Sequence, residues 1–121
     1  MKVKEIGFVG IPVTDIERSK KFYEGVLGLQ QAGQFMNGQW IEYGIGKDTL
    51  AIANVGDDWR PSDQGTGAAL EVEDFDEAIR DLRAANVPFV GEPGESPVCH
   101  MAIVQDPDGN KVVIHKLKPT S

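Results

Sequence analysis

The stretch that decides the fold is residues 11–28, IPVTDIERSKKFYEGVLG. An apolar run over residues 6–13 leads into it and predicts a β-strand. The letters TDIE then have the spacing of a capping box, with Thr14 as the N-cap and Glu17 at the third helical position. Apolar side chains recur at helical spacing beyond the box, and Gly28 is a typical helix stop. The stretch therefore predicts a strand followed by an amphipathic helix.

The same pattern returns in the second half of the chain. Val13 recurs as Val72 and Asp15 recurs as Asp74, with the same offset, and each Val-x-Asp leads into a helical pattern. For the second helix we expect Asp74 as the N-cap. The other runs typical of strands are residues 30–35, 39–44, 49–55, 68–72, 88–90, 98–105 and 111–117. The order βαβββ thus occurs twice.

This order predicts an α+β fold in a single domain. Each βαβββ unit has one sheet face that a helix covers and one that needs another partner. We expect the two repeats to form a curved mixed sheet around a cleft, with the helices on the outside. Repeat one spans residues 1–56, a polar connector spans 57–66, and repeat two spans 67–121.

Charge and composition exclude several classes of function. The net charge is −7 and the 12 lysines and arginines are scattered, so we expect neither nucleic acid nor an anionic membrane surface as a partner. No apolar run approaches the roughly 20 residues that span a bilayer. Cys99 is the chain's single cysteine and cannot form an internal disulfide, which favours a cytoplasmic location.

Residues 11–28, together with the later turn DPDGN at 106–110, resemble the vicinal oxygen chelate superfamily. This superfamily contains glyoxalase I, the bleomycin-resistance proteins and the extradiol dioxygenases. The resemblance implies the paired βαβββ fold with a ligand cleft formed by both repeats. It also implies a homodimer, because members of the superfamily often pair through these sheets.

The resemblance also implies where a metal would bind. In the family's metal enzymes four ligands line the cleft, two from each repeat, and the corresponding positions here are Phe8, Ile52, Gly67 and Val113. None of these side chains offers the lone pair that a divalent ion needs. We therefore expect no metal and no cofactor. An apolar cleft remains, similar to that of the family's drug-sequestering members, and its expected ligand is a small apolar or aromatic molecule.

Strand alternation extends the set of expected ligand-binding positions. The set is Phe8, Ile52, Gly67, Cys99, Met101, Val113 and His115. His115 lies two residues beyond Val113 and shares its face. Three roles are open for His115: a ligand contact, a general base near neutral pH, or a rim residue without a role in function. The turn at 106–109 predicts that Met101 faces His115.

Cys99 and His100 are adjacent, so they point to opposite faces of a strand and do not form a dyad. Cys99 is expected diagonal to His115, about 7–8 Å away, which is too far for direct contact. His100 is expected on the helix side. The sequence does not identify a catalytic residue; His115 and Cys99 are the candidates.

The aromatic residues leave alternatives open. Trp40 and Glu42 share one strand face and Tyr43 takes the other, so either aromatic ring stacks a planar ligand or packs in the core. Trp59 and Arg60 in the connector cap the cleft over an anionic ligand or, as we favour, the tryptophan seals a core edge. Glu71 shares the face of Gly67, either as a carboxylate at the cleft mouth or as a solvated strand end.

Three functions fit these observations. The first is a metal-independent small-molecule-binding protein of the glyoxalase/bleomycin-resistance type. The second is a lyase or isomerase of the glyoxalase-like class, with His115 as base or with a rebuilt metal site. The third is a regulatory or interaction domain whose vestigial cleft is filled by its own side chains.

Overall fold

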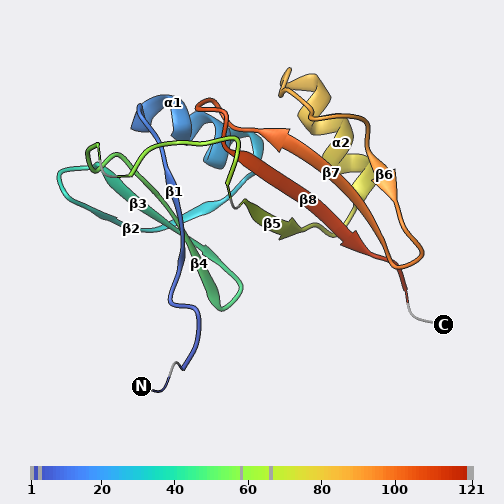
Figure 1. Ribbon diagram of the computed structural model, residues 1–121, viewed down its shortest axis with the longest axis horizontal. Coiled ribbons are helices and arrows are strands. Elements are labelled where there is room, and N and C mark those ends of the chain that lie inside the picture. The colour runs from blue at the N-terminus through green and yellow to red at the C-terminus, as the bar shows by residue number, and fades with distance from the viewer. Residues whose placement is uncertain (1, 3, 58, 66, 120–121) are drawn as a thin grey trace. The chain divides into compact units, whose positions relative to one another are not determined.

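The computed structural model describes residues 2, 4–57, 59–65 and 67–119 (Figure 1). The chain divides into two compact units, Met1–Pro61 and Ser62–Ser121, and the boundary falls within the predicted connector. Each unit has its own sheet and its own helical segment. No helix in the described part of the chain is long and apolar enough to cross a membrane.

Both units have the order βαβββ, so the predicted α+β fold is confirmed. The first unit contains β1 (Val9–Pro12), α1 (Ile16–Lys20), a π-helix η1 (Lys21–Val26), β2 (Gln30–Phe35), β3 (Trp40–Ile45) and β4 (Asp48–Ala53). The second contains β5 (Ala68–Glu71), α2 (Phe75–Ala84), β6 (Gly94–Glu95), β7 (Cys99–Gln105) and β8 (Lys111–Leu117). The strand orders are β1-β4-β3-β2 and β5-β8-β7-β6, with the first pair of each sheet parallel and the others antiparallel (Figure 1).

The helix starts show the repeat most clearly, and they correct one prediction. The N-cap of α1 is Asp15, not Thr14: the Asp15 side chain accepts a hydrogen bond from the backbone N–H of Arg18 at 3.1 Å. Asp74 caps α2 in the same way, accepting from the N–H of Glu77 at 3.0 Å, as expected. Thr14 instead accepts from the Arg18 guanidinium at 3.1 Å. The cap is thus the aspartate that both repeats share.

The first helix also departs from the predicted regular α-helix. Its second half is the π-helical segment η1, in which the N–H of Leu27 bonds to the carbonyl of Phe22 at 2.9 Å. The adjacent side chains Phe22 and Tyr23 are both buried. Gly28 follows with φ of 71°, a left-handed conformation that favours glycine, so the predicted stop is confirmed.

The edge strand of the second unit was predicted at residues 88–90 and lies later. Phe89 makes only an isolated bridge with Val104, and the strand β6 forms at Gly94–Glu95. Pro88 cannot donate to a ladder, and Gly91 has φ of 73°, which interrupts the extended backbone. The edge is therefore broken into a bridge and a short strand.

In the first sheet, alternation along β3 separates a helix side from a second face. Ile41 and Tyr43 are buried. The Tyr43 hydroxyl donates to Glu24 of η1 at 2.9 Å, and burial together with this carboxylate raises the pKa of Tyr43 far above its usual range. Trp40 and Glu42 therefore belong to the opposite face. Of the two aromatic residues on β3, Tyr43 is the one that packs in the core.

In the second sheet, α2 packs on one face. Phe75 stacks on His100 with ring centroids 5.4 Å apart, so His100 lies on the helix side as predicted. The core residues of this side are Ala68, Leu82, Ala102, Val104, Val112 and Ile114. The opposite face carries Cys99, Met101, Val113 and His115, whose side chains are partly or largely exposed.

The turn between β7 and β8 is a buried polar network. The Asp106 carboxylate accepts from the N–H groups of Asp108 and Asn110 at 2.9 and 2.8 Å and from the Asn110 side chain at 2.9 Å. Asn110 in turn accepts from the backbone N–H of Ser62 at 3.1 Å. This turn pairs Gln105 with Lys111 and sets Met101 opposite His115, as the sequence predicts.

Candidate functional site

An aromatic cluster stands on the face of the first sheet opposite the helix. Phe8 precedes β1 and meets Trp40 edge-on, with ring centroids 5.4 Å apart. Trp59, from the segment that follows β4, stacks on Trp40 at 6.1 Å with an interplanar angle of 26°. The register also pairs Phe35 with Trp40 on this face. We call Phe8, Phe35, Trp40, Glu42 and Trp59 the aromatic face.

Small residues form the floor beneath these rings. Gly10 of β1 pairs with Ala51 of β4, which pairs with Glu42 of β3. A Cβ atom at Gly10 would lie 2.7 Å from two ring atoms of Trp59, so glycine is needed for the indole to rest on the strand. Trp59 thus covers the strand β1 and stacks on Trp40. Arg60, for which an anionic ligand was the less favoured alternative, forms an ion pair with Asp57 at 3.3 Å.

Glu42 is the charged group of the aromatic face. It is half-buried and accepts a hydrogen bond from the Trp40 indole N–H at 3.0 Å. Beside it lies an open hollow of about 370 Å³ lined by Phe35, Met36, Trp40 and Glu42. Phe35 and Met36 are 53% and 59% exposed, so the hollow has apolar walls available to a ligand.

A second cluster occupies the corresponding face of the second sheet. The His115 Nδ1 lies 2.6 Å from Glu71 Oε1, because the parallel pairing of β5 and β8 sets these residues side by side. Glu71 Oε2 also accepts from the backbone N–H of Leu117 at 2.8 Å. The hydrogen bond to His115, followed by that from Leu117, lowers the pKa of Glu71. We call Glu71, Cys99, Met101, Val113 and His115 the histidine face.

The bond between Glu71 and His115 was not predicted from the sequence. Alternation places Glu71 on the same face as Gly67, but its partner depends on the register of two strands far apart in the chain. With Nδ1 held by the carboxylate, the imidazole has a fixed orientation and its Nε2 is directed away from Glu71. This is the arrangement of an oriented proton acceptor.

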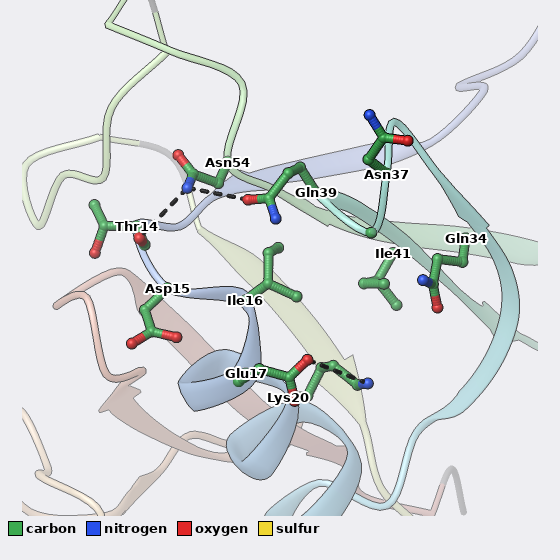
Figure 2. A pocket seen from close by; sticks show the side chains of 11 residues that line it. Thr14, Asp15, Ile16, Glu17, Lys20, Gln34, Asn37, Gln39, Ile41 and Asn54 are labelled. Carbon is green, nitrogen blue, oxygen red and sulfur yellow. Dashed lines mark hydrogen bonds and ion pairs between the residues drawn. The ribbon is translucent and has the colours of Figure 1, made fainter.

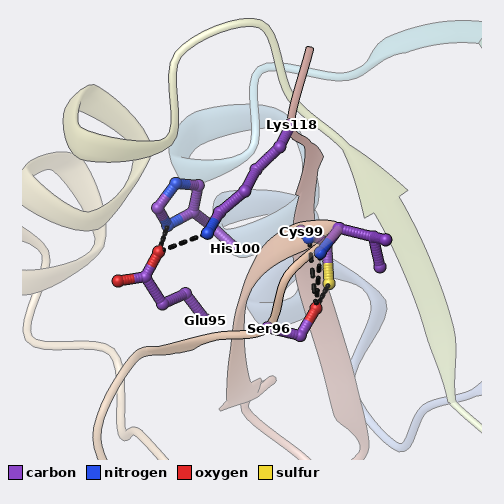
Figure 3. Close-up of polar contacts among 6 residues, drawn as sticks. Glu95, Ser96, Cys99, His100 and Lys118 are labelled. Atoms are coloured by element: carbon purple, nitrogen blue, oxygen red, sulfur yellow. Dashed lines mark hydrogen bonds and ion pairs between the residues drawn. The ribbon is translucent and has the colours of Figure 1, made fainter. Parts of the chain in front are cut away.

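Cys99 and His100 diverge, as the sequence predicts (Figure 3). The Cys99 thiol lies 3.3 Å from the Ser96 hydroxyl, beside a pocket of about 260 Å³. His100 lies 3.9 Å from Glu95, which also binds Lys118 at 2.6 Å. The thiol therefore faces a neutral hydroxyl rather than the neighbouring imidazole.

The structure places five of the seven expected ligand-binding positions on these two faces. Cys99, Met101, Val113 and His115 lie on the histidine face, and Phe8 lies on the aromatic face. Gly67 directly precedes β5, and a Cβ atom there would meet the Lys111 carbonyl oxygen. Ile52 does not lie on either face. It is fully buried, pairs with Ile41 and Ile11, and lies on the helix side. The expected position was wrong by one residue, since Ala51 and Ala53 are the β4 residues on the face of Trp40.

The residues at the family's metal positions do not fit a metal ion. The side chains of Phe8 and Val113 are hydrocarbons, as are those of Ala51 and Ala53, the β4 residues on the face of Trp40. A side chain at Gly67 would meet the Lys111 carbonyl oxygen at 2.6 Å. Across the described residues, no group of three or more histidine, cysteine or acidic side chains is arranged to hold a metal.

A hollow of about 400 Å³ in the first unit lies on the helix side of its sheet, apart from the aromatic face (Figure 2). It is lined by the start of α1 and by β2–β3 residues on the helix side, including Ile16 and Ile41. The Asn54 amide there donates to Gln39 at 3.2 Å and to the Thr14 carbonyl at 3.5 Å. We assign no site there.

Comparison with known proteins fits this fold. The crystal structure of TnmS3, an antibiotic binding protein from Streptomyces sp. CB03234, aligns with a TM-score of 0.81 and 23% identity over 98% of this chain and 99% of that one. A glyoxalase/dioxygenase from Nostoc punctiforme aligns at 0.81 and 16% identity, over 96% and 92%. A lactoylglutathione lyase from Agrobacterium tumefaciens aligns at 0.73 and 19% identity, over 95% of each chain.

No curated protein matches the sequence. The family model "Glyoxalase/Bleomycin resistance protein/Dioxygenase superfamily" matches residues 5–114, nearly the whole chain. The chain belongs to the glyoxalase/bleomycin resistance protein/dioxygenase superfamily.

Proposed function

We propose that this protein binds a flat, apolar small molecule without the help of a metal. The observation that carries the proposal is the aromatic face, where Trp40 and Trp59 stack over a floor of small residues. Stacked indoles with an exposed hollow beside them are suited to a planar ring system. TnmS3, an antibiotic binding protein with the same fold, supports a small-molecule ligand.

The lack of donor side chains supports a metal-independent mode of binding. With hydrocarbons or glycine at all four family positions, ring stacking and apolar contact remain as sources of affinity. A homodimer and a cytoplasmic location complete the proposal, as the resemblance and the single cysteine favour them.

Tryptophan fluorescence gives a direct test. The chain has two tryptophans and both lie on the aromatic face, so every indole signal reports on this site. Protein dialysed against EDTA is titrated with acridine, an anthraquinone and bleomycin. We expect saturable quenching by at least one of them, weakened about tenfold or more by Trp40→Ala. The control is Phe75→Leu, which removes an aromatic ring from the helix side of the second unit. Equal binding by Trp40→Ala and the parent protein contradicts the proposal.

A second candidate function rests on the bond between Glu71 and His115. It is an isomerase or lyase in which His115 Nε2 takes a proton from a carbon beside a carbonyl and returns it to another atom of the same molecule. The test is exchange of deuterium from solvent into small ketones, followed by NMR. Exchange that His115→Ala abolishes and His100→Ala retains supports this function, and exchange unaffected by His115→Ala contradicts it. His100 is a matched control because its ring stacks on Phe75 on the helix side.

A further inference from the structure

We infer that the aromatic face selects flat cations: aromatic ring systems that carry a positive charge, with Glu42 as the counter-charge. The inference rests on the proposed binding function and assigns the chemical class of its ligand. Its basis is the hollow that Glu42 shares with Phe35, Met36 and Trp40.

The hollow has the composition of a cation-binding site. Its volume of about 370 Å³ lies within the range of small-molecule pockets, and its lining combines two aromatic rings, a thioether and one carboxylate. Aromatic faces attract cations through the ring quadrupole, and a nearby carboxylate adds a full negative charge. Neither the aromatic rings nor the carboxylate attract an anionic ligand, and a neutral ligand forms no ion pair with the carboxylate.

Glu42 has no positive partner among the residues that the structure describes. Among the described residues, its hydrogen bond is to the neutral indole N–H of Trp40 at 3.0 Å, and no lysine, arginine or histidine forms an ion pair with it. A half-buried carboxylate keeps a stronger field than a fully solvated one. The net charge of −7 also raises the local concentration of cations around the protein. A ligand cation would complete the missing pair.

Backbone strain at the same place is a second, independent observation. Met36 and Asn37 both have φ of 55°, and the turn is closed by hydrogen bonds from Gly38 to Phe35 and from Gln39 to Met36, each 3.1 Å. Asparagine tolerates this left-handed region, but methionine rarely adopts it. The Met36 side chain, which is adaptable and apolar, is exposed at the rim of the hollow, and backbone strain of this kind clusters at ligand sites.

Three acridines of nearly the same shape test the inference. N-methylacridinium is a permanent cation, acridine is neutral above neutral pH, and acridine-9-carboxylate is an anion. Affinities are measured by isothermal titration calorimetry on EDTA-dialysed protein. We expect the cation to bind about tenfold more tightly than neutral acridine, and the anion to bind most weakly.

The matched variants are Glu42→Gln and Glu73→Gln. Both remove one negative charge, and the glutamine at position 42 can still accept from Trp40, so the stack is retained. We expect Glu42→Gln to abolish the preference for the cation, because the affinity for N-methylacridinium falls to that for neutral acridine. Glu73 is an exposed residue of the second unit, and its variant retains the preference.

The outcomes separate the two claims. Equal affinities for the cation and acridine, or a cation preference that survives Glu42→Gln, overturn the inference while the proposed binding function stands. Binding of none of the three acridines overturns both the inference and the proposed function. A cation preference lost in Glu42→Gln and kept in Glu73→Gln supports the inference.

Discussion

Gly10→Ala is the smallest change that disturbs the aromatic face. The added Cβ would lie 2.7 Å from two carbon atoms of the Trp59 ring, whereas carbon atoms in contact are about 3.5 Å apart or more. The ring edge must therefore retreat by about 0.8 Å, the difference between these distances. Trp59 is half-buried and lies outside the strands, so it can move. We expect the stack on Trp40 to loosen at a cost of about 1 kcal/mol in unfolding free energy.

The expected effect on binding follows from the energy of an aromatic stack. Such a pair is worth about 0.5–1.5 kcal/mol beyond its buried area, which corresponds to a loss of about two- to tenfold in affinity for a planar ligand. The assay is circular dichroism of the coupled indoles, together with calorimetric titration of acridine. Gly7→Ala is the control, because a Cβ there meets nothing within 4 Å. An unchanged indole spectrum and unchanged affinity in Gly10→Ala would refute the reasoning.

Three further predictions concern stability. Asp106→Ala removes a buried acceptor of three hydrogen bonds and should lower the unfolding free energy, measured by chemical denaturation, by about 2–4 kcal/mol. Asp106→Asn should lower it by less. Equal unfolding free energies for the parent protein and Asp106→Ala would contradict this prediction. Ser19→Ala removes a fully buried hydroxyl that lacks a partner among the described residues, so stability should stay the same or rise by about 1 kcal/mol, and a clear loss would show a hidden partner. The pKa of Glu71 is lowered from 4.5 in the folded protein, so its pairing with His115 stabilises the fold above pH 4.5, and this stabilisation is lost as the pH falls through the folded pKa. Glu71→Gln should therefore lower the melting temperature near neutral pH, and the melting temperatures of the variant and the parent protein should converge in acid. A difference in melting temperature that is constant at all pH values argues against this prediction.

The sequence predicted features that depend on local chemistry. The shared aspartate of the two repeats marks both helix starts, and Gly28 marks the end of the first helical segment. The turn at 106–109 fixed the register of the last hairpin, so the opposition of Met101 and His115 was predictable from spacing alone. The choice of Thr14 over Asp15 as the cap failed because both adjacent residues are good caps.

Features that depend on contacts far apart in the chain were not predictable. Alternation gave Trp40 and Tyr43 opposite faces, but only the sheet's packing on η1 shows which face is buried. The stack of Trp59 needs a close approach to Gly10, and nothing in the local sequence indicates it. The strand alignment that suggested Ile52 was loose, and an error of one residue moves a side chain to the other face.

The most direct test of metal-free binding at the aromatic face uses the two indole N–H signals in a proton–nitrogen correlation spectrum. N-methylacridinium is added to protein kept in EDTA. We predict that the signals of both Trp40 and Trp59 shift and saturate together, since both rings belong to one stack. Indole signals that stay fixed while other amides shift, or that shift only after a divalent metal is supplied, would contradict the account.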